Sequence, residues 1–229
     1  MTGSRDAILG RIREALRVEA PHHAHAKIAT GNAPVTAPFR EWLPAVGPTE
    51  ADRVALFARL SEMLKTEFIE CADMTSAAVQ LHRLVSENGW KKIAIHDGKL
   101  MNALLAKTDG TLETMSADGS YDKFEMEQCD AGITECECLV AQTGSICITT
   151  WSSGGRALSV LPPHHIVIAS RAQVLADLTS AYELLAQKYA GKYPSFISFI
   201  TGPSRTGDIE RILVLGAHGP KKLTVLLVP

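Results

Sequence analysis

The sequence predicts an α/β protein with a mainly parallel sheet flanked by helices. Short apolar, β-branched segments alternate with longer segments whose apolar residues recur every three or four positions. Parallel strands joined by crossover helices produce that alternation. Residues 165–169 and 223–228 are apolar almost throughout, which indicates strands covered on both faces. At 229 residues, the chain is long enough for one such domain with its own core.

Residues 1–48 are expected to form an N-terminal helix and an extended arm. Ile8, Ile12 and Leu16 recur at four-residue spacing and predict one apolar stripe on a helix that Ser4 can cap. The prolines that follow exclude a helix, and they are Pro21, Pro34, Pro38, Pro44 and Pro48. The arm can dock onto a partner or be a loosely attached terminus, and the sequence leaves both interpretations open.

Residues 49–229 are expected to form the α/β domain. Thr49 and Asp52 have the spacing of a capping box ahead of a helix. The elements expected next are a strand at Phe68–Ile69, a helix over Asp73–Asn88 that stops at Gly89, a strand at Ile93–Ile95 and a helix opened by Asp97 that runs through Leu105. Between Gly110 and Gln128 the pattern is weak.

The second half of this domain is richer in strands. Residues 139–141 and 146–148 flank a turn that contains glycine and predict a β-hairpin. The elements expected next are a buried strand at His165–Ala169, a long helix from Val174 to Gly191, a buried strand at Phe196–Ile200, a short strand at Leu213–Leu215 and a covered strand at Leu223–Val228. Most loops that could carry function therefore lie in the C-terminal half.

Composition excludes some classes of protein. Lys plus Arg is 23 and Asp plus Glu is 25, so the net charge is −2, and no basic stretch suits a nucleic-acid binder. No segment approaches the roughly 20 apolar residues of a membrane helix. The charged, amphipathic start of the chain lacks the apolar core of a signal peptide, so a cytoplasmic location is expected.

Metal binding by this chain is not expected. The five cysteines are odd in number and irregularly spaced, and Cys136 and Cys138 lie beside an apolar strand, so buried, reduced thiols are favoured over a metal site. His22, His23 and His25 form a short cluster on the arm. No carboxylate or cysteine accompanies them, which favours solvated histidines.

One candidate site is the loop from Gly202 to Glu210. It directly follows an expected strand, at the carboxyl end where ligands gather in open α/β sheets, and Gly202 permits a tight turn. Ser204 or Thr206 can cap a short helix that includes Asp208 and Glu210, and free N–H groups at such a helix start favour an anion. Arg205 could add a fork for a carboxylate or phosphate. A capped turn with an exposed arginine is the structural alternative.

Other candidates lie on two further loops. His218, bracketed by Gly216 and Gly219, could be a general acid or base, although a lone histidine is often structural. The turn Thr143-Gly144-Ser145 and Arg156 could form an anion cradle. We expect the turn, the Gly202–Glu210 loop and His218 to converge on one pocket for a small carboxylate. His218 would be its proton carrier, with Asp208 and Glu210 orienting donors or loops.

Several of these segments resemble the LUD domain, in the branch of lactate-utilisation protein C. They are Ala131–Thr134, Ala141–Ser145, Arg156–Pro162, Gly202–Ser204, Asp208–Glu210 and Gly216–Pro220. The resemblance implies a NagB/RpiA/CoA-transferase-like fold and a role in bacterial oxidation of L-lactate to pyruvate. It also implies two iron–sulfur proteins as partners, which would carry the clusters, with no cofactor in this chain. The sequence departs from the family at Gln142, where glutamate is common.

Three functions follow as hypotheses. The favoured one is a non-redox subunit of a lactate-oxidising system, which binds a small carboxylate or organises the iron–sulfur partners, because no flavin, nicotinamide or cluster motif is present. The second is a stand-alone isomerase or acyl/CoA-transfer enzyme that uses Glu137, Asp208, Glu210 or His218. The third is an assembly protein without a small-molecule site.

Overall fold

The computed structural model describes residues 4–15, 17, 42–108, 110, 112–118, 121–206, 214–216 and 218–229. The chain divides into two units, residues 1–41 and 42–229. The first unit contains helix α1 (Ser4–Ala15), which confirms the expected N-terminal helix. Ile8 and Ile12 on α1 are exposed, while Leu16 and His22, His23 and His25 lie outside the described residues.

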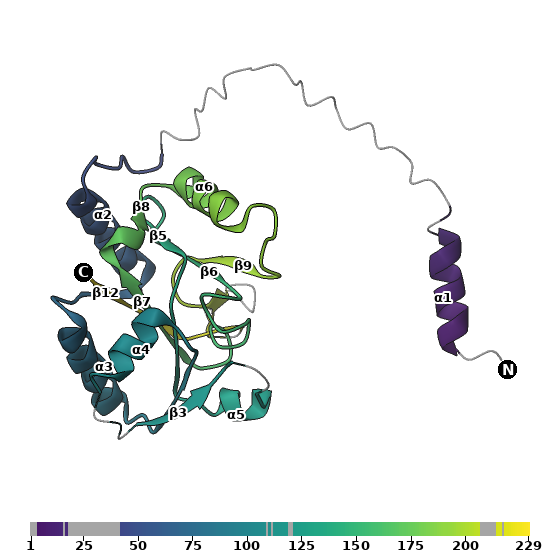
Figure 1. Ribbon diagram of the computed structural model, residues 1–229, viewed down its shortest axis with the longest axis horizontal. Coiled ribbons are helices and arrows are strands. Elements are labelled where there is room, and N and C mark those ends of the chain that lie inside the picture. Colours follow the sequence, from purple (N-terminus) through teal and green to yellow (C-terminus); the bar gives the residue numbers. More distant parts are fainter. Residues whose placement is uncertain are drawn as a thin grey trace, which may run out of the picture. The chain divides into compact units, whose positions relative to one another are not determined.

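A six-stranded, entirely parallel sheet forms the centre of the second unit (Figure 1). Its strands, in spatial order, are β1 (Glu67–Glu70), β12 (Lys222–Val228), β7 (His164–Ser170), β4 (Ala131–Thr134), β2 (Lys92–Ile95) and β3 (Glu113–Ser116). Strands β12 and β7 pair along their full lengths, from Lys222 opposite His164 to Val228 opposite Ser170. The predicted parallel α/β fold is confirmed.

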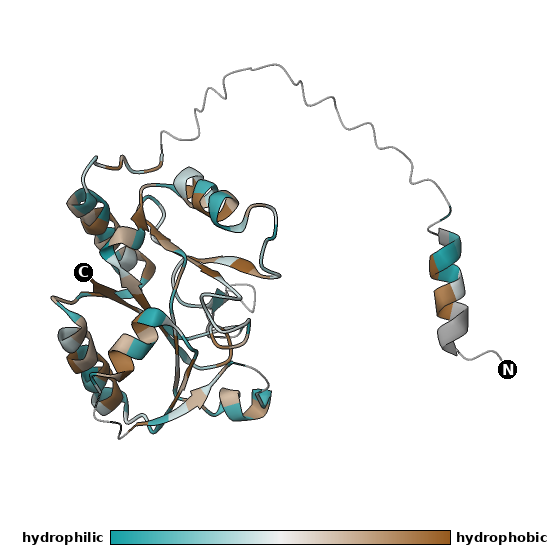
Figure 2. Cartoon of the chain, in the orientation of Figure 1, coloured by the Kyte–Doolittle hydropathy of each residue, from teal (hydrophilic) through white to brown (hydrophobic). Residues whose placement is uncertain are grey.

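Both faces of this sheet are covered, as its apolar strands predict. On β12, Leu223, Val225 and Leu227 pack on one face, whereas Leu226 and Val228 pack on the other. Helices α3 (Met74–Asn88) and α4 (Lys99–Leu105) cover the face that carries Leu226. Figure 2 shows apolar residues concentrated on the strands and on single faces of the helices.

The opposite face is covered by helix α2 (Glu50–Leu64) and a second, four-stranded sheet. That sheet has the order β8 (Val174–Leu175), β5 (Cys138–Val140), β6 (Ser145–Thr149) and β9 (Ile197–Ile200). Strands β5 and β6 are antiparallel and confirm the predicted hairpin. Helix α6 (Leu178–Tyr189) packs on the outer face of this sheet, against Cys138, Val140 and Cys147. The smaller elements are α5 (Lys123–Glu127), a 3₁₀ turn at Arg171–Gln173, and the paired strands β10 (Arg205–Thr206) and β11 (Val214–Leu215).

Local capping signals were read correctly in two helices. Thr49 and Asp52 form the expected capping box at α2, and Asp73 caps α3, which ends at left-handed Gly89. The start of α6 differs from the prediction, because Asp177 caps a helix that begins at Leu178. Val174 instead pairs with Leu139 as strand β8, a long-range contact that helical periodicity does not reveal.

The expected cap at Asp97 is wrong. Helix α4 begins after Gly98, and its free N–H groups at Leu100 and Met101 donate to the Glu135 carboxylate at 2.7 and 3.0 Å. A Cβ at position 98 would lie 2.3 Å from that carboxylate oxygen. A side chain 35 residues away therefore takes the capping role.

The five cysteines are buried and form no disulfide. Cys136 packs between the two sheets, whereas Cys138 faces α6. Burial raises the pKa of the Cys136 thiol. None of the described helices is long and apolar enough to cross a membrane.

The packing of β12 predicts a large cost for shortening Leu226. Leu226→Ala is expected to lower the free energy of unfolding by roughly 2–5 kcal/mol, because Leu226 is fully buried and truncation leaves a cavity. Val79→Ala on α3 is the control, since Val79 is 59% exposed and should change stability by less than about 1 kcal/mol. Urea denaturation measures both, and equal effects would contradict the buried position of Leu226.

Candidate functional site

A cavity of about 170 Å³ lies where the two sheets meet. The parallel sheet contributes His165 at the start of β7 and Leu223 at the start of β12. The second sheet contributes Ser198 and Ile200 from β9. The remaining described lining residues come from loops and are Ser159, Val160, Phe196, Gly202, Pro203, Ser204, His218, Gly219 and Pro220. The cavity therefore has a floor of strands and a rim of loops.

Strand alternation explains why β9 presents Ser198 and Ile200 to this cavity. Ile197 and Phe199 point to the opposite side and pack with α6. Strand β9 is half-buried, which corrects the prediction of a buried strand at Phe196–Ile200, and it begins at Ile197. One of its faces borders an open cavity, so it cannot be packed on both sides.

The loop after β9 and the loop before β12 close the rim, and backbone hydrogen bonds join them. The Ser204 N–H donates to the Pro220 carbonyl at 2.9 Å, and the Gly216 N–H donates to the Ser204 carbonyl at 3.0 Å. Gly202 has a φ of +88°, and a Cβ there would lie 2.9 Å from the Leu64 carbonyl at the end of α2. Glycine at this position thus lets the first loop turn tightly against α2.

Two buried lining residues carry polar atoms without partners. Ser159 is 3% exposed and His165 is 1% exposed, and neither Ser159 Oγ nor His165 Nδ1 has a hydrogen-bond partner among the described residues. The other ring nitrogen of His165 lies 2.8 Å from Thr134 Oγ1. Buried polar atoms are rarely left unpaired without a ligand or water to bind them. These two atoms therefore mark the cavity as a polar binding site.

Ser159 reaches the cavity because β4 carries a glycine at the crossing point. A Cβ on Gly132 would lie 2.4 Å from the Leu158 carbonyl, so only glycine allows the segment before β7 to cross so closely. Sequence reasoning missed Ser159 and Ser198. It considered His164 and His165 as a metal or acid–base pair but favoured a rigid entry into the strand, although a histidine in a buried, β-branched strand is a signal for a site.

Several predicted site residues lie together here. Gly202, Ser204 and His218 line the cavity, with His218 exposed at its rim. Arg205 does not line it but lies in an adjoining groove. Asp208 and Glu210 lie outside the described residues. Arg205 and Thr206 pair with β11 as strand β10, and the short helix expected after them lies outside the described residues.

The turn Thr143-Gly144-Ser145 does not line the cavity, contrary to the expected convergence. Thr143 donates its hydroxyl hydrogen to Ser145 Oγ, and Ser145 Oγ lies 2.8 Å from Thr201 Oγ1. A Cβ at Gly144 would lie 2.7 Å from Leu64 on α2. The turn therefore contacts Thr201, the residue before Gly202, and supports the loop that begins there. Gln142, beside it, donates its amide to the Pro44 carbonyl at 3.1 Å, which a glutamate could not do.

Arg156 is also outside the cavity. Its guanidinium donates to the Ser195 carbonyl at 3.1 Å and is otherwise exposed. This contact holds the loop ahead of Phe196, which itself lines the cavity. Arg156 therefore acts on the site through the position of that loop.

The cavity lies at the amino ends of β7 and β12, and this corrects the predicted position at carboxyl ends. The rule for open sheets places ligands beyond the carboxyl ends of parallel strands. The prediction applied this rule to the loop after β9, but β9 pairs antiparallel with β6 in the second sheet and is not a strand of the parallel sheet. Because tertiary pairing decides the direction of β9, the loop after it lies at the amino ends of the parallel strands.

Glu137, a candidate base in the enzyme hypothesis, is instead locked in a buried network. Its carboxylate accepts hydrogen bonds from Thr149 at 2.7 Å, Lys188 at 2.6 Å and Tyr189 at 2.6 Å. Burial alone would raise the pKa of Glu137, but the hydrogen bonds from Lys188, Tyr189 and Thr149 outweigh it and lower the pKa. This network fastens α6 to the second sheet, and it does not reach the cavity.

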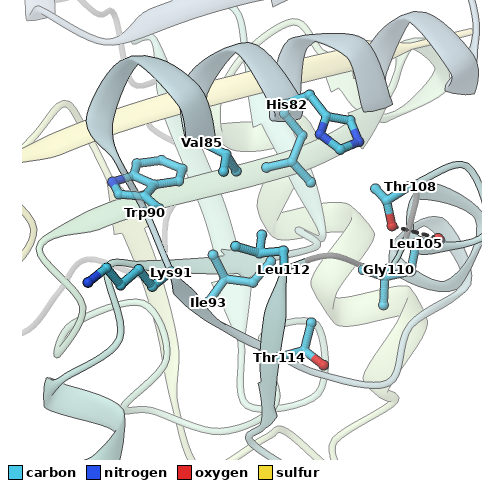
Figure 3. Close-up of a pocket in the computed structure, with 11 residues that line it drawn as sticks. His82, Val85, Trp90, Lys91, Ile93, Leu105, Thr108, Gly110, Leu112 and Thr114 are labelled. Carbon is cyan, nitrogen blue, oxygen red and sulfur yellow. Dashed lines mark hydrogen bonds between the residues drawn. The ribbon is translucent and has the colours of Figure 1, made fainter.

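A larger pocket of about 530 Å³ lies between α3 and the β2–β3 edge of the parallel sheet (Figure 3). Its walls combine apolar side chains such as Val85, Trp90 and Leu112 with polar ones such as Lys91 and Thr114. The Thr108 hydroxyl in it is satisfied by the Leu105 carbonyl at 2.8 Å. None of its described lining residues carries a buried polar atom without a partner. The inter-sheet cavity is therefore the better candidate site.

The chemistry available in the cavity suits a small anion. Among its described lining residues are three serines and two histidines, but no carboxylate. Burial lowers the pKa of His165 to about 3, so its imidazole is neutral near pH 7. Hydroxyl and imidazole donors can bind a carboxylate, and exposed His218 can carry a proton to or from it.

Comparison with known proteins gives one consistent result. The profile of the LUD domain family matches residues 45–228. Lactate utilization protein C of Bacillus subtilis is 30% identical over 96% of this chain and 91% of its own length. Lactate utilization protein C of Geobacillus kaustophilus is 27% identical over 82% of this chain and 83% of its own length.

A solved structure has the same fold. The crystal structure of a DUF162 family protein from Deinococcus radiodurans aligns with a TM-score of 0.64 at 17% identity, covering 80% of this chain and all of the other. At that identity, the likeness concerns the fold alone.

His165 predicts that stability falls in acid. Its pKa is about 6.5 when unfolded and about 3 when folded, so protons bind the unfolded chain first. Stability is full above about pH 6.5 and is lost toward pH 3 at up to about 1.4 kcal/mol per pH unit from this group. Urea denaturation between pH 7 and 4.5 measures the slope. His165→Gln should reduce this slope by the contribution of about one proton, whereas Ser159→Ala, in the same cavity, should keep the wild-type slope.

Proposed function

The chain belongs to the LUD domain family, beside relatives named lactate utilization protein C, and we propose that it takes part in lactate utilisation by binding a small carboxylate in the inter-sheet cavity. The observation that carries this proposal is the pair of unpartnered buried atoms, Ser159 Oγ and His165 Nδ1, in a cavity of about 170 Å³. That volume suits a molecule of three carbons such as L-lactate or pyruvate.

In this proposal the chain is a non-redox subunit of an L-lactate-oxidising system. Conversion of lactate to pyruvate releases two electrons and two protons. The electrons would pass to two iron–sulfur partner proteins, and this chain would hold the carboxylate or organise those partners. Among the described residues, no group of three or more His, Cys, Asp or Glu side chains is placed to hold a metal ion.

The lining residues have distinct proposed roles. Ser159 and Ser204 would donate hydrogen bonds to the carboxylate, and neutral His165 would orient it from the floor of the cavity. His218, exposed at the rim, would exchange protons with solvent and with the bound acid. Thr143, Ser145 and Arg156 would hold the surrounding loops in place.

Ligand binding tests the cavity with a closely matched pair of variants. L-Lactate or pyruvate should bind the wild-type protein in isothermal titration calorimetry. Ser159→Ala should weaken binding about fivefold to tenfold, since it removes one hydrogen-bond donor. Ser61→Ala is the control, because Ser61 is also buried with an unpartnered hydroxyl but does not line the cavity. Equal affinities for all three proteins would contradict the proposed site.

Growth and co-purification test the pathway. A strain that depends on this protein for growth on L-lactate should grow more slowly with His218→Ala, at normal protein levels. The tagged protein should also co-purify with two proteins that contain iron and acid-labile sulfide. Unimpaired growth would make His218 structural, and purification of the chain without such partners would remove the proposed complex.

A further inference from the structure

A basic groove adjoins the cavity at the amino ends of the parallel strands. Its volume is about 450 Å³, and it shares Pro203 and Leu223 with the cavity. Its other described lining residues are Lys65, Glu67, His164, Arg205, Lys221, Lys222 and Thr224. Four cations thus surround one carboxylate, so the groove favours an anion.

The four cations differ in whether their side chains already make hydrogen bonds or ion pairs within the protein. Lys222 donates to Asn88 Oδ1 at 2.9 Å. Lys65, Arg205 and Lys221 are exposed and make no side-chain hydrogen bond or ion pair with the described residues. Glu67 is already neutralised by Arg83, whose guanidinium lies 2.7 Å from it. Three positive charges therefore remain available to a ligand.

A glycine in a rim loop makes room for one of these cations. Gly216, with a φ of +76°, lies under the Lys221 side chain, and a Cβ there would come within 2.2 Å of Lys221 Cγ. A loop that closes the cavity therefore also positions Lys221 in the groove.

His164 supplies a second, independent sign of a ligand. It is 4% exposed, and its Nδ1 has no partner among the described residues. Thr224 donates its single hydroxyl hydrogen to Glu67 at 3.0 Å, so at the 2.8 Å contact between His164 Nε2 and Thr224 Oγ1 the imidazole must donate. Nδ1 is then a bare acceptor. Burial lowers the pKa of His164 to about 4, which keeps that lone pair free near pH 7.

We propose that the ligand of this site is a small hydroxy acid that carries a phosphate group, with its carboxylate in the inter-sheet cavity and its phosphate in the basic groove. The inference rests on the proposed function for the carboxylate end. Lys65, Arg205 and Lys221 bind the phosphate, and the Nδ1 of His164 accepts a hydrogen bond from a ligand hydroxyl. The two spaces adjoin at Pro203 and Leu223, and the proposed ligand would span this boundary.

The test compares three probes on the full chain by isothermal titration calorimetry at low salt. They are L-lactate, inorganic phosphate and the L enantiomer of 3-phosphoglycerate, which is L-lactate with a phosphate ester on its methyl carbon. We expect 3-phosphoglycerate to bind at least tenfold more tightly than L-lactate. The ratio should shrink toward one at 0.5 M salt (about 4 Å Debye length), because the groove cations are exposed.

Variants test whether the groove causes the tighter binding of 3-phosphoglycerate. The double variant Arg205→Gln/Lys221→Gln should remove most of the difference between 3-phosphoglycerate and L-lactate. Lys107→Gln/Lys192→Gln, which removes two exposed lysines outside the groove, is the charge-matched control and should keep it. Thermal unfolding of each variant confirms that it is folded before titration.

The remaining outcomes separate this inference from the proposed function. Equal affinity for L-lactate and 3-phosphoglycerate would overturn the phosphate-bearing ligand and leave the carboxylate site standing. Binding of inorganic phosphate as tight as that of 3-phosphoglycerate, lost in the double variant, with no binding of L-lactate, would reduce the groove to an isolated anion site and overturn both. Absence of binding by either phosphate-bearing probe would overturn the inference.

Discussion

The packing of the second, four-stranded sheet against one face of the parallel sheet is the constraint on which the rest of the structure depends. Leu139, Ile146 and Ile148 pack against Val167 and Val225 in one apolar cluster. Near the middle of the strands these side chains are fully buried. At the amino ends of β7 and β12 the two sheets separate around polar side chains, and the cavity opens there. The site is therefore a consequence of where inter-sheet packing stops.

Satisfaction of buried polar groups distinguishes the structural network from the candidate site. The carboxylates of Glu135 and Glu137 accept two and three hydrogen bonds, which hold α4 and α6 in place. Ser159 and His165 are at least as deeply buried but leave a polar atom unpaired. Since an unpaired buried group costs about 1–3 kcal/mol, its retention is readily explained by a ligand.

Sequence reasoning named three loop residues that line the cavity, Gly202, Ser204 and His218, because glycine beside a polar residue is visible locally. It missed Ser159 and Ser198, because their positions depend on the crossing at β4 and on the pairing of β9 in the second sheet. Thr143 and Arg156 looked alike as anion ligands, yet the structure uses them to hold neighbouring loops.

The sequence by itself determined the parallel α/β sheet, the β5–β6 hairpin and the capped starts of α2 and α3, because each depends on periodicity or on residues three or four apart. Tertiary structure alone decided that β9 joins a second sheet, that Glu135 caps α4, and that the loops after β9 and before β12 meet at the amino ends of the strands. These features pair residues 12 to 54 positions apart. Local propensity carries no information about such pairs, since the packing of whole elements brings them together.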